Sequence, residues 1–173
     1  SLVNNANIIS KIYFPSIILP ASSIIVGLID FFISLIILAI LMLFYRFVPN
    51  WRIVFMPLFL ILALIFTFGI GILFAALNVK YRDFRYIVTF VVQFGLYVSP
   101  VGFSSDIVPT KWKFLYSLNP MVGVIDGFRW SIMGKNFSIY LPGLVLSMVL
   151  AFIILVIGVF YFRRAEKTFA DRI

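Results

Sequence analysis

Long apolar runs alternate with short polar segments along the chain. Four of the runs, at residues 17–45, 53–77, 86–103 and 139–162, contain almost no charged side chains. A membrane-spanning helix needs roughly 17–25 mainly apolar residues to cross about 30 Å of hydrocarbon, and each run is at least that long. The pattern therefore predicts an all-α integral membrane protein with four transmembrane helices.

Composition agrees with this prediction and excludes several functions. Hydrophobic residues make up 64% of the chain and charged residues 12%, whereas charged residues approach a quarter of a soluble domain. Cysteine and histidine are absent, which excludes disulfides, thiolate or imidazole metal sites and nucleophile–histidine pairs. The net charge of +8 comes from basic residues at the ends of apolar runs, so they are interpreted as membrane anchors and not as a nucleic-acid surface.

Basic residues also predict the orientation. Four crossings place both ends on one side, and eight of the 14 Lys and Arg residues fall on the segments of that side. The positive-inside rule then makes both ends cytoplasmic, with residues 163–173 as a cytoplasmic tail. The chain begins at Ser1 without a signal peptide, and we expect it to be N-terminally incomplete.

Residues 1–16 predict a short amphipathic helix before the first crossing. Ile9 and Tyr13 lie on its apolar side, Asn7 and Lys11 lie on its polar side, and Pro15 stops it. Such a helix either lies in the lipid headgroups or docks a soluble partner. The sequence leaves both possibilities open.

Small and polar side chains form stripes on the first two apolar runs. In the first run, Asp30 shares a face with Gly27 and Ser34. A carboxylate that faces lipid is costly, so Asp30 either joins helices or lines a pathway. In the second run, close helix packing explains a stripe of small residues at every fourth position: Ala63, Thr67, Gly71 and Ala75.

The third run carries a face that mixes rings with hydrogen-bonding groups. Thr89, Gln93 and Tyr97 share this face with Tyr86 and Pro100. Such a face suits the path of an amphipathic or sugar-bearing molecule, because rings offer apolar area while hydroxyl and amide groups exchange hydrogen bonds. Tyr86 also fits an aromatic belt at the membrane surface.

Residues 104–138 are too broken to span. Two amphipathic pieces, Lys111 to Leu118 and Met121 to Met133, are separated by Asn119 and Pro120. Thirteen residues reach only about 20 Å as a helix, so we predict a pair of short re-entrant extracytoplasmic helices beside a channel mouth or exit gate, with a plain outer loop as the alternative. Asp126 and Arg129 are spaced to neutralise each other.

Five motifs in order resemble a known family. They are Asn4-Asn5-Ala6-Asn7 with Lys11-Ile12-Tyr13-Phe14-Pro15, Ala76-Leu77-Asn78-Val79-Lys80-Tyr81-Arg82-Asp83, Leu118-Asn119-Pro120-Met121, Gly127-Phe128-Arg129-Trp130, and Phe162-Arg163-Arg164-Ala165-Glu166-Lys167-Thr168-Phe169-Ala170-Asp171. Together they resemble the permease subunit of bacterial type-2 ABC exporters of polysaccharides and polyol phosphates, which export O-antigen, capsule or teichoic acid. The resemblance covers the later part of such a transmembrane domain, so the four crossings would be the family's third to sixth.

This resemblance implies roles for the segments. The coupling helix that inserts into a partner ABC ATPase would include Asn7, Ile9, Lys11 and Tyr13, and a second cytoplasmic contact would include Lys80 and Arg82. The extracytoplasmic gate would be built around Asn119 and Pro120, with Asp126 and Arg129. It also implies a homodimer in the bacterial cytoplasmic (inner) membrane, with lipid-linked glycan passing between the copies as in lipopolysaccharide biosynthesis. The chain itself would bind no cofactor, and ATP and Mg would be bound by the ATPase.

Two other functions remain open. One is a type-2 ABC exporter of the same fold that moves a small drug or lipid. The other is a membrane-embedded enzyme that modifies glycolipids, which is disfavoured because the chain lacks His and Cys and has only six carboxylates. ATP hydrolysis within this chain is not expected, since it contains no phosphate-binding G-x-x-x-x-G-K-[ST] loop.

Overall fold

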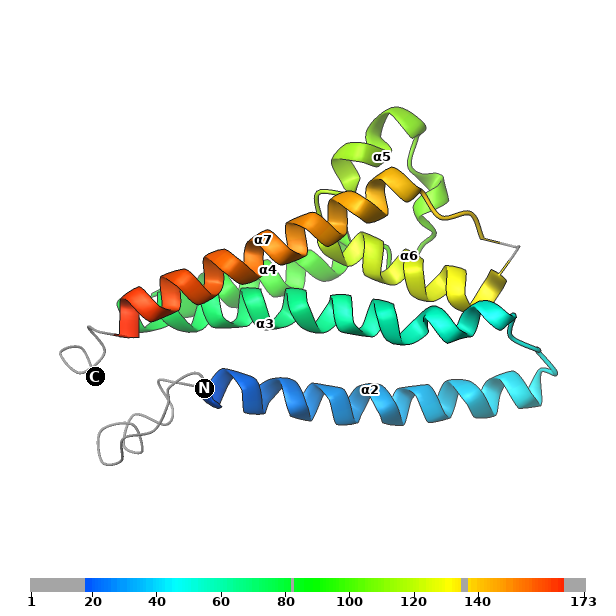
Figure 1. Cartoon of the computed structure of the whole chain (residues 1–173), viewed down its shortest axis with the longest axis horizontal. Helices are drawn as coiled ribbons and strands as arrows, with labels where there is room; N and C mark the ends of the chain where they lie inside the picture. The colour runs from blue at the N-terminus through cyan, green and yellow to red at the C-terminus, as the bar shows by residue number, and fades with distance from the viewer. Residues whose placement is uncertain (1–17, 82, 135–136, 167–173) are drawn as a thin grey trace.

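The computed structural model describes residues 18–81, 83–134 and 137–166 (Figure 1). Within these residues every regular element is helical, which confirms the predicted all-α class. The α-helices are α2 (Ile18–Phe44), α3 (Met56–Lys80), α4 (Phe84–Val98), α5 (Thr110–Tyr116), α6 (Pro120–Met133) and α7 (Leu141–Glu166), and the short 3-10 helices are η2 (Trp51–Phe55) and η3 (Ser105–Ile107). The predicted amphipathic helix at 1–16 lies outside the described residues.

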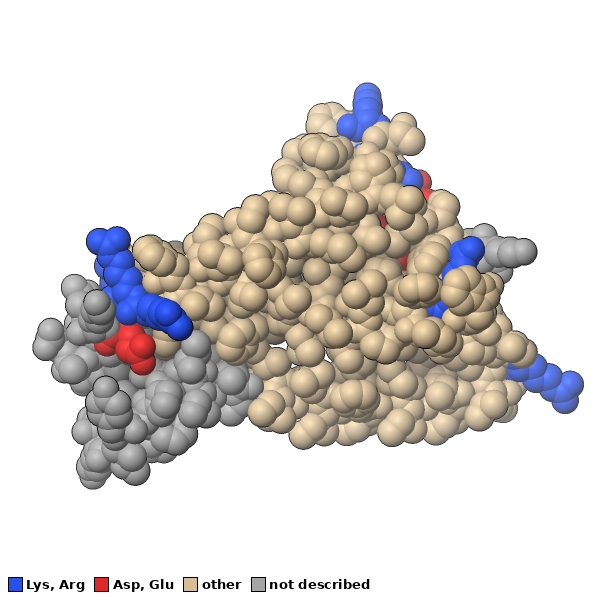
Figure 2. Space-filling model, viewed as in Figure 1, with Lys and Arg blue, Asp and Glu red and all other residues tan. Residues whose placement is uncertain are grey.

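Three of the four predicted crossings are confirmed as helices long and apolar enough to span a bilayer. Within the described chain they are Ile24–Phe44 in α2, the continuous segment Trp51–Lys80, and Leu141–Glu166. On the face shown in Figure 2, charged side chains gather at the two ends of the long axis and around α5, and the surface between them is uncharged. This distribution is typical of a protein whose helices run across a membrane.

The fourth predicted crossing, at 86–103, is not confirmed. Its helix α4 has 15 residues and ends at Val98, so it reaches about 22 Å, which is less than the roughly 30 Å of hydrocarbon. The reason is Pro100, which disfavours helical geometry at the preceding residue. Ser99 is extended, with φ −80° and ψ 147°, and its amide closes the helix on the Gly95 carbonyl. Pro100 is buried and does not extend the predicted exposed face.

Helices α3 and α7 run in the same direction and form the most extensive packing in the described chain (Figure 1). Ile72, Ala76 and Phe162 are buried between them. The backbones come very close at Gly69, where an added Cβ would lie 2.6 Å from the Leu155 Cα. Gly71, which belonged to the predicted packing stripe, has no such neighbour within 4 Å. Ala63 and Ala75 of that stripe pack against the buried clusters while Thr67 is exposed, so the contact face includes only part of the predicted stripe.

Helix α6 fills the space where α3 and α7 diverge (Figure 1). A Cβ on Gly123 would lie 2.5 Å from the Ser147 Cβ of α7, and Gly127 lies directly against the Phe59 ring of α3. Seven of the 14 residues of α6 are buried. These close contacts make α3, α6 and α7 one tightly packed body.

The two ends of α6 meet different parts of the chain. At its C-terminal end, Gly134 has a φ of 64° and its carbonyl accepts a 2.9 Å hydrogen bond from Arg52 of η2. Arg52 also lies 4.8 Å from the centre of the Trp130 ring. At its N-terminal end, Asn119 bonds to Ser99, directly after α4. The bounds of α5 and α6 match the two predicted short helices, and their re-entrant placement stays a prediction.

Candidate functional site

Three of the four predicted pathway residues, Thr89, Gln93 and Tyr97, lie on a face of α4 that points away from α3. None of the 15 residues of α4, all of them described, is buried. Tyr97 is 79% exposed, and Thr89 and Gln93 are exposed on the same side. The residues that are half-covered lie on the opposite side, at Phe84, Val88 and Gly95. The helix thus offers its polar and aromatic groups to something other than its own core.

Next to these polar groups, the face carries a ring pair. Phe90 and Phe94 stack with centroids 6.0 Å apart and an interplanar angle of 11°. The Thr89 hydroxyl donates to the Arg85 carbonyl within its own helix. A strip of rings with interspersed amide and hydroxyl groups can contact both apolar surface and sugar hydroxyls.

Asp30 is exposed on α2, and its side chain does not connect α2 to another helix of the described chain. The Ser34 hydroxyl donates to the main-chain carbonyl of Asp30, at 2.8 Å, and Gly27 has open space around it. Helix α2 contacts the rest of the chain through a neighbouring face, where the Phe31 and Phe128 rings lie 5.7 Å apart. The polar stripe of α2, like that of α4, is therefore open.

The predicted second ATPase contact lies at the end of the molecule where α3 and α7 finish. The ammonium of Lys80 lies 5.2 Å from the Tyr81 ring centre and 6.0 Å from that of Tyr161. The last turn of α7 adds Arg163 and Arg164. Outside the described residues lie the other predicted contacts: Asn7, Ile9, Lys11, Tyr13 and Arg82.

Three of the four predicted gate residues are brought together with others in what we call the α5–α6 cluster, and the fourth, Pro120, is buried at the start of α6. The members of the cluster are Asp106, Lys113, Tyr116, Asn119, Asp126 and Arg129. Asp126 is only 7% exposed, and its Oδ1 lies 3.9 Å from the Arg129 Nη1. Neither of these two atoms has a hydrogen-bond partner in the described chain. The pair predicted from sequence spacing is therefore present but loose.

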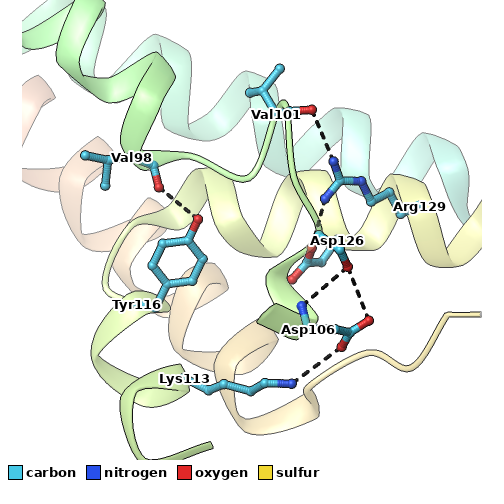
Figure 3. Close-up of polar contacts among 8 residues, drawn as sticks. Val98, Val101, Asp106, Lys113, Tyr116, Asp126 and Arg129 are labelled. Carbon is cyan, nitrogen blue, oxygen red and sulfur yellow. Dashed lines mark hydrogen bonds and ion pairs between the residues drawn. The ribbon is translucent and has the colours of Figure 1, made fainter. Parts of the chain in front are cut away.

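Arg129 also reaches the segment that follows α4. Figure 3 shows its guanidinium between Asp126 and the Val101 carbonyl, to which Nη2 donates at 3.2 Å. A second ion pair lies nearby, with the Lys113 Nζ 3.5 Å from the Asp106 Oδ1. The four charges balance, so the cluster is neutral.

Burial sets the protonation behaviour of the cluster. Desolvation raises the pKa of Asp126 and the charge of Asp106 adds to that rise, while Ser105, Arg129 and Lys113 oppose it. Burial also raises the pKa of Tyr116, with a further contribution from the charge of Asp126. The Tyr116 phenol therefore stays protonated at neutral pH and remains a donor.

Asn119 and Tyr116 link three parts of the chain. The Asn119 Oδ1 accepts a 3.0 Å bond from the Met121 amide and so caps α6, while its Nδ2 donates to the Ser99 hydroxyl at 2.9 Å. The Tyr116 hydroxyl donates to the Val98 carbonyl at 2.8 Å. Sequence reasoning missed Tyr116 and Ser99. The signal that could have located this junction is Pro100, which fixes where α4 ends.

The side chains at these sites are suited to non-covalent contacts: hydrogen bonds, ion pairs and ring contacts. In the described part of the chain, no group of three or more His, Cys, Asp or Glu side chains is placed to hold a metal ion. Open polar strips, paired charges and helix-end hydrogen bonds can contact a passing molecule or hold helices in place.

Comparisons with known proteins agree with this picture. Residues 3–133 match the profile of the family described as ABC-2 type transporter. Two proteins of Klebsiella pneumoniae named O-antigen export system permease protein RfbA are 27% identical over 99% of this chain and 66% of their own length. One of the same name from Myxococcus xanthus is 26% identical over 75% of this chain and 50% of its own length. The inner membrane transport permease YadH of Escherichia coli K12 is 32% identical over 61% of this chain and 41% of its length. The chain thus spans just under two thirds of the Klebsiella relatives.

Proposed function

This chain belongs to the ABC-2 type transporter family, and we propose that it acts as the membrane-spanning permease of an ATP-driven exporter. The proposed cargo is a lipid-linked polysaccharide or polyol phosphate that crosses the bacterial cytoplasmic membrane. The names of the relatives that align over almost the whole chain, O-antigen export permeases, support a glycan cargo. The three long apolar helices support a multi-pass membrane protein.

The observation that carries the proposal is the open face of α4. Tyr97, Gln93 and Thr89 point away from the packed body of α3, α6 and α7. An amide left facing lipid would lack hydrogen-bond partners, and such a group costs free energy in hydrocarbon. A hydrated pathway next to this face removes that cost. Sugar hydroxyls can exchange hydrogen bonds with Gln93 and Thr89 while the Tyr97 ring contacts their apolar faces.

A second copy of the chain completes the pathway in this proposal. The polar stripe of α2 around Asp30 is as open as the face of α4. A carboxylate within a membrane helix faces protein or water by default. A homodimer with the glycan between its copies would surround Asp30 with both protein and water.

The energy would come from a separate ABC ATPase that binds ATP and Mg. Its docking surface is proposed at the end of the molecule where Lys80, Arg163 and Arg164 gather. These basic side chains favour the cytoplasmic side by the positive-inside rule. The predicted coupling helix would add to this surface.

A second candidate is an exporter of a different cargo, such as a small drug or lipid. The similarity to YadH, whose name gives no glycan, favours it over part of the chain. Both candidates are permeases and differ only in their cargo. Deleting the gene and identifying the molecule that is no longer exported therefore distinguishes them.

The test uses the complete permease gene in its native bacterium. Deleting it should abolish one surface glycan and leave the lipid-linked precursor on the inner side, and the wild-type gene should restore export. Affinity purification of the permease should recover an ABC ATPase. An unchanged set of surface glycans would overturn the glycan proposal, and purification without any ATPase would overturn the exporter proposal itself.

A further inference from the structure

Helix α4 is attached to the chain very unevenly along its length. No residue between Phe84 and Val98 is buried. By contrast, three side chains of the α5–α6 cluster bond to the short stretch 98–101, where the helix ends. The attachment of α4 is therefore concentrated at one point.

The three bonds are all donated by side chains of the α5–α6 cluster. Tyr116 donates to the Val98 carbonyl at 2.8 Å, Asn119 to the Ser99 hydroxyl at 2.9 Å, and Arg129 to the Val101 carbonyl at 3.2 Å. Figure 3 shows the first and third of these bonds on either side of the loop that leaves α4. The three acceptors lie within four consecutive residues, so the bonds act on one short segment.

The chemistry of a helix end explains why donors are found beside this segment. The last carbonyls of a helix have no donor within the helix, and Pro100 has no N–H to offer. Away from bulk water, such a carbonyl needs another donor, because an unsatisfied backbone group is costly there. Tyr116 and Arg129 supply donors at Val98 and Val101, which ties the helix end to them.

Two of the three donors sit at a firmly held element, and the third, Tyr116, belongs to α5, which has no buried residue. Asn119 and Arg129 flank or belong to α6, which is packed between α3 and α7 through Gly123 and Gly127. Rings add to this hold, since Phe128 lies 6.3 Å from Phe59. The junction at 98–101 is thus fixed to the packed body.

The other end of α4 is joined to α3 by residues 81–83, and the Phe84 amide donates to the Tyr81 carbonyl at 3.0 Å. There the Phe84 ring meets Phe74 of α3 edge-on, with centroids 5.9 Å apart, and Asp83 and Arg85 are exposed. Val98 lies 14 residues from Phe84, which is about 21 Å along the helix. A rotation about the end at Val98 moves the Phe84 end the furthest, and it carries the segment that joins α4 to α3 with it.

We propose that residues 98–101 form a pivot about which α4 swings, and that Tyr116, Asn119 and Arg129 are positioning residues that hold it. This inference rests on the proposed transport function, in which α4 borders the cargo path. The end of α4 at Phe84 swings during the ATP cycle, while the end at Val98 stays against α6. Thr89 and Gln93 then travel further than Tyr97, so the path changes width mainly at the basic end.

Spin-label distances test the pivot directly, because the chain has no cysteine of its own. The complete permease with its ATPase is reconstituted in lipid nanodiscs. One cysteine pair, Ile87 with Ile157, reports the Phe84 end of α4, and a second pair, Leu96 with Met133, reports the pivot. All four side chains are exposed. A non-hydrolysable ATP analogue should shift the first distance and leave the second unchanged.

Two conservative variants probe the pivot bonds themselves. Tyr116→Phe removes one hydroxyl, and Ser99→Ala removes the acceptor of the Asn119 bond while Asn119 still caps α6. Each should broaden the distance distribution of the pivot pair, even in the permease without its ATPase. The control Tyr45→Phe removes an exposed hydroxyl from the end of α2 and should leave that distribution unchanged.

The outcomes separate this inference from the proposed function. Equal shifts of both pairs, or no shift of either, overturn the pivot. A pivot pair that stays narrow in both Tyr116→Phe and Ser99→Ala overturns the role of the Tyr116 and Asn119 bonds. Failure of the permease to bind any ATPase overturns the proposed function instead, while the width of the pivot distribution still reports on the bonds.

Discussion

Helices α4 and α6 are almost equal in length and opposite in environment. Helix α4 has 15 residues, none of them buried, while α6 has 14 residues, of which seven are buried. A proline lies at the junction end of each: Pro100 follows α4, and Pro120 begins α6. The difference shows that helix α6 packs within the fold of this chain, whereas the faces of α4 are left open.

Glycine placement explains the contrast at the level of single residues. Gly123 and Gly127 are one turn apart on α6, and each allows a neighbouring helix to come into direct contact. Helix α4 has a single glycine, Gly95, with no such neighbour within 4 Å. Exposed aromatic side chains occupy much of its remaining surface, including Tyr86 at 71%.

The largest expected effect comes from adding a methyl group to each helix in turn. Gly123→Ala should lower the free energy of unfolding by about 1–3 kcal/mol, because its Cβ would overlap the Ser147 side chain. Gly95→Ala should be neutral or raise it by up to about 1 kcal/mol, since alanine favours helix and the space is open. Thermal unfolding of both variants in the same detergent checks the pair. Equal losses would show that α4 is packed as α6 is.

The next effect comes from removing an arginine from each helix. Arg129→Ala leaves the buried carboxylate of Asp126 without its nearest positive charge, at a cost toward the lower end of about 1–3 kcal/mol. The double variant with Asp126→Asn should recover part of this loss, because no buried charge remains. Arg85→Ala on exposed α4 should stay within about 0.5 kcal/mol of wild type. A double variant less stable than Arg129→Ala would show that the Val101 bond outweighs the ion pair.

A smaller effect is expected from pH. Burial raises the pKa of Asp126 above its usual value, so protonation favours the folded state. The stabilising contribution is complete below the unfolded pKa of about 3.9 and is lost as the pH rises through the elevated folded value. The melting temperature of wild type relative to Asp126→Asn should therefore increase from neutral to acidic pH. A constant difference between the two would contradict the elevated pKa.

Local signals in the sequence predicted α5 and α6 well, whereas the end of α4 was predicted from hydrophobicity and not from Pro100. The Asn119-Pro120 break placed the start of α6 within one residue, because Asn caps helices and Pro fits their first turn. The predicted end of α4 was wrong because the run stays apolar through Phe103, and hydrophobicity alone does not mark a helix end. Pro100 does, through its effect on Ser99.

Contacts between distant segments could not be predicted from one sequence. Gly69 and Gly71 look alike on α3, and only the position of α7 decides that Gly69 makes the close approach. Asp126 and Arg129 were found because they are one turn apart on a single helix. The bond from Tyr116 to Val98 joins residues 18 positions apart, and nothing in their spacing indicates it.

The smallest effect on stability, and the sharpest test of the contrast, comes from the open face of α4. Changing Gln93 and Tyr97 together to Leu should alter the free energy of unfolding by no more than about 0.5 kcal/mol, because both side chains are exposed. Export of the surface glycan by the complete permease should nevertheless fall, since the path loses an amide and a phenol that exchange hydrogen bonds with sugars. Membrane levels and ATPase association serve as controls, and both should match wild type. Unchanged export would leave α4 as a lipid-facing or packing helix, and a large loss of stability would show that its face is buried in the assembled protein.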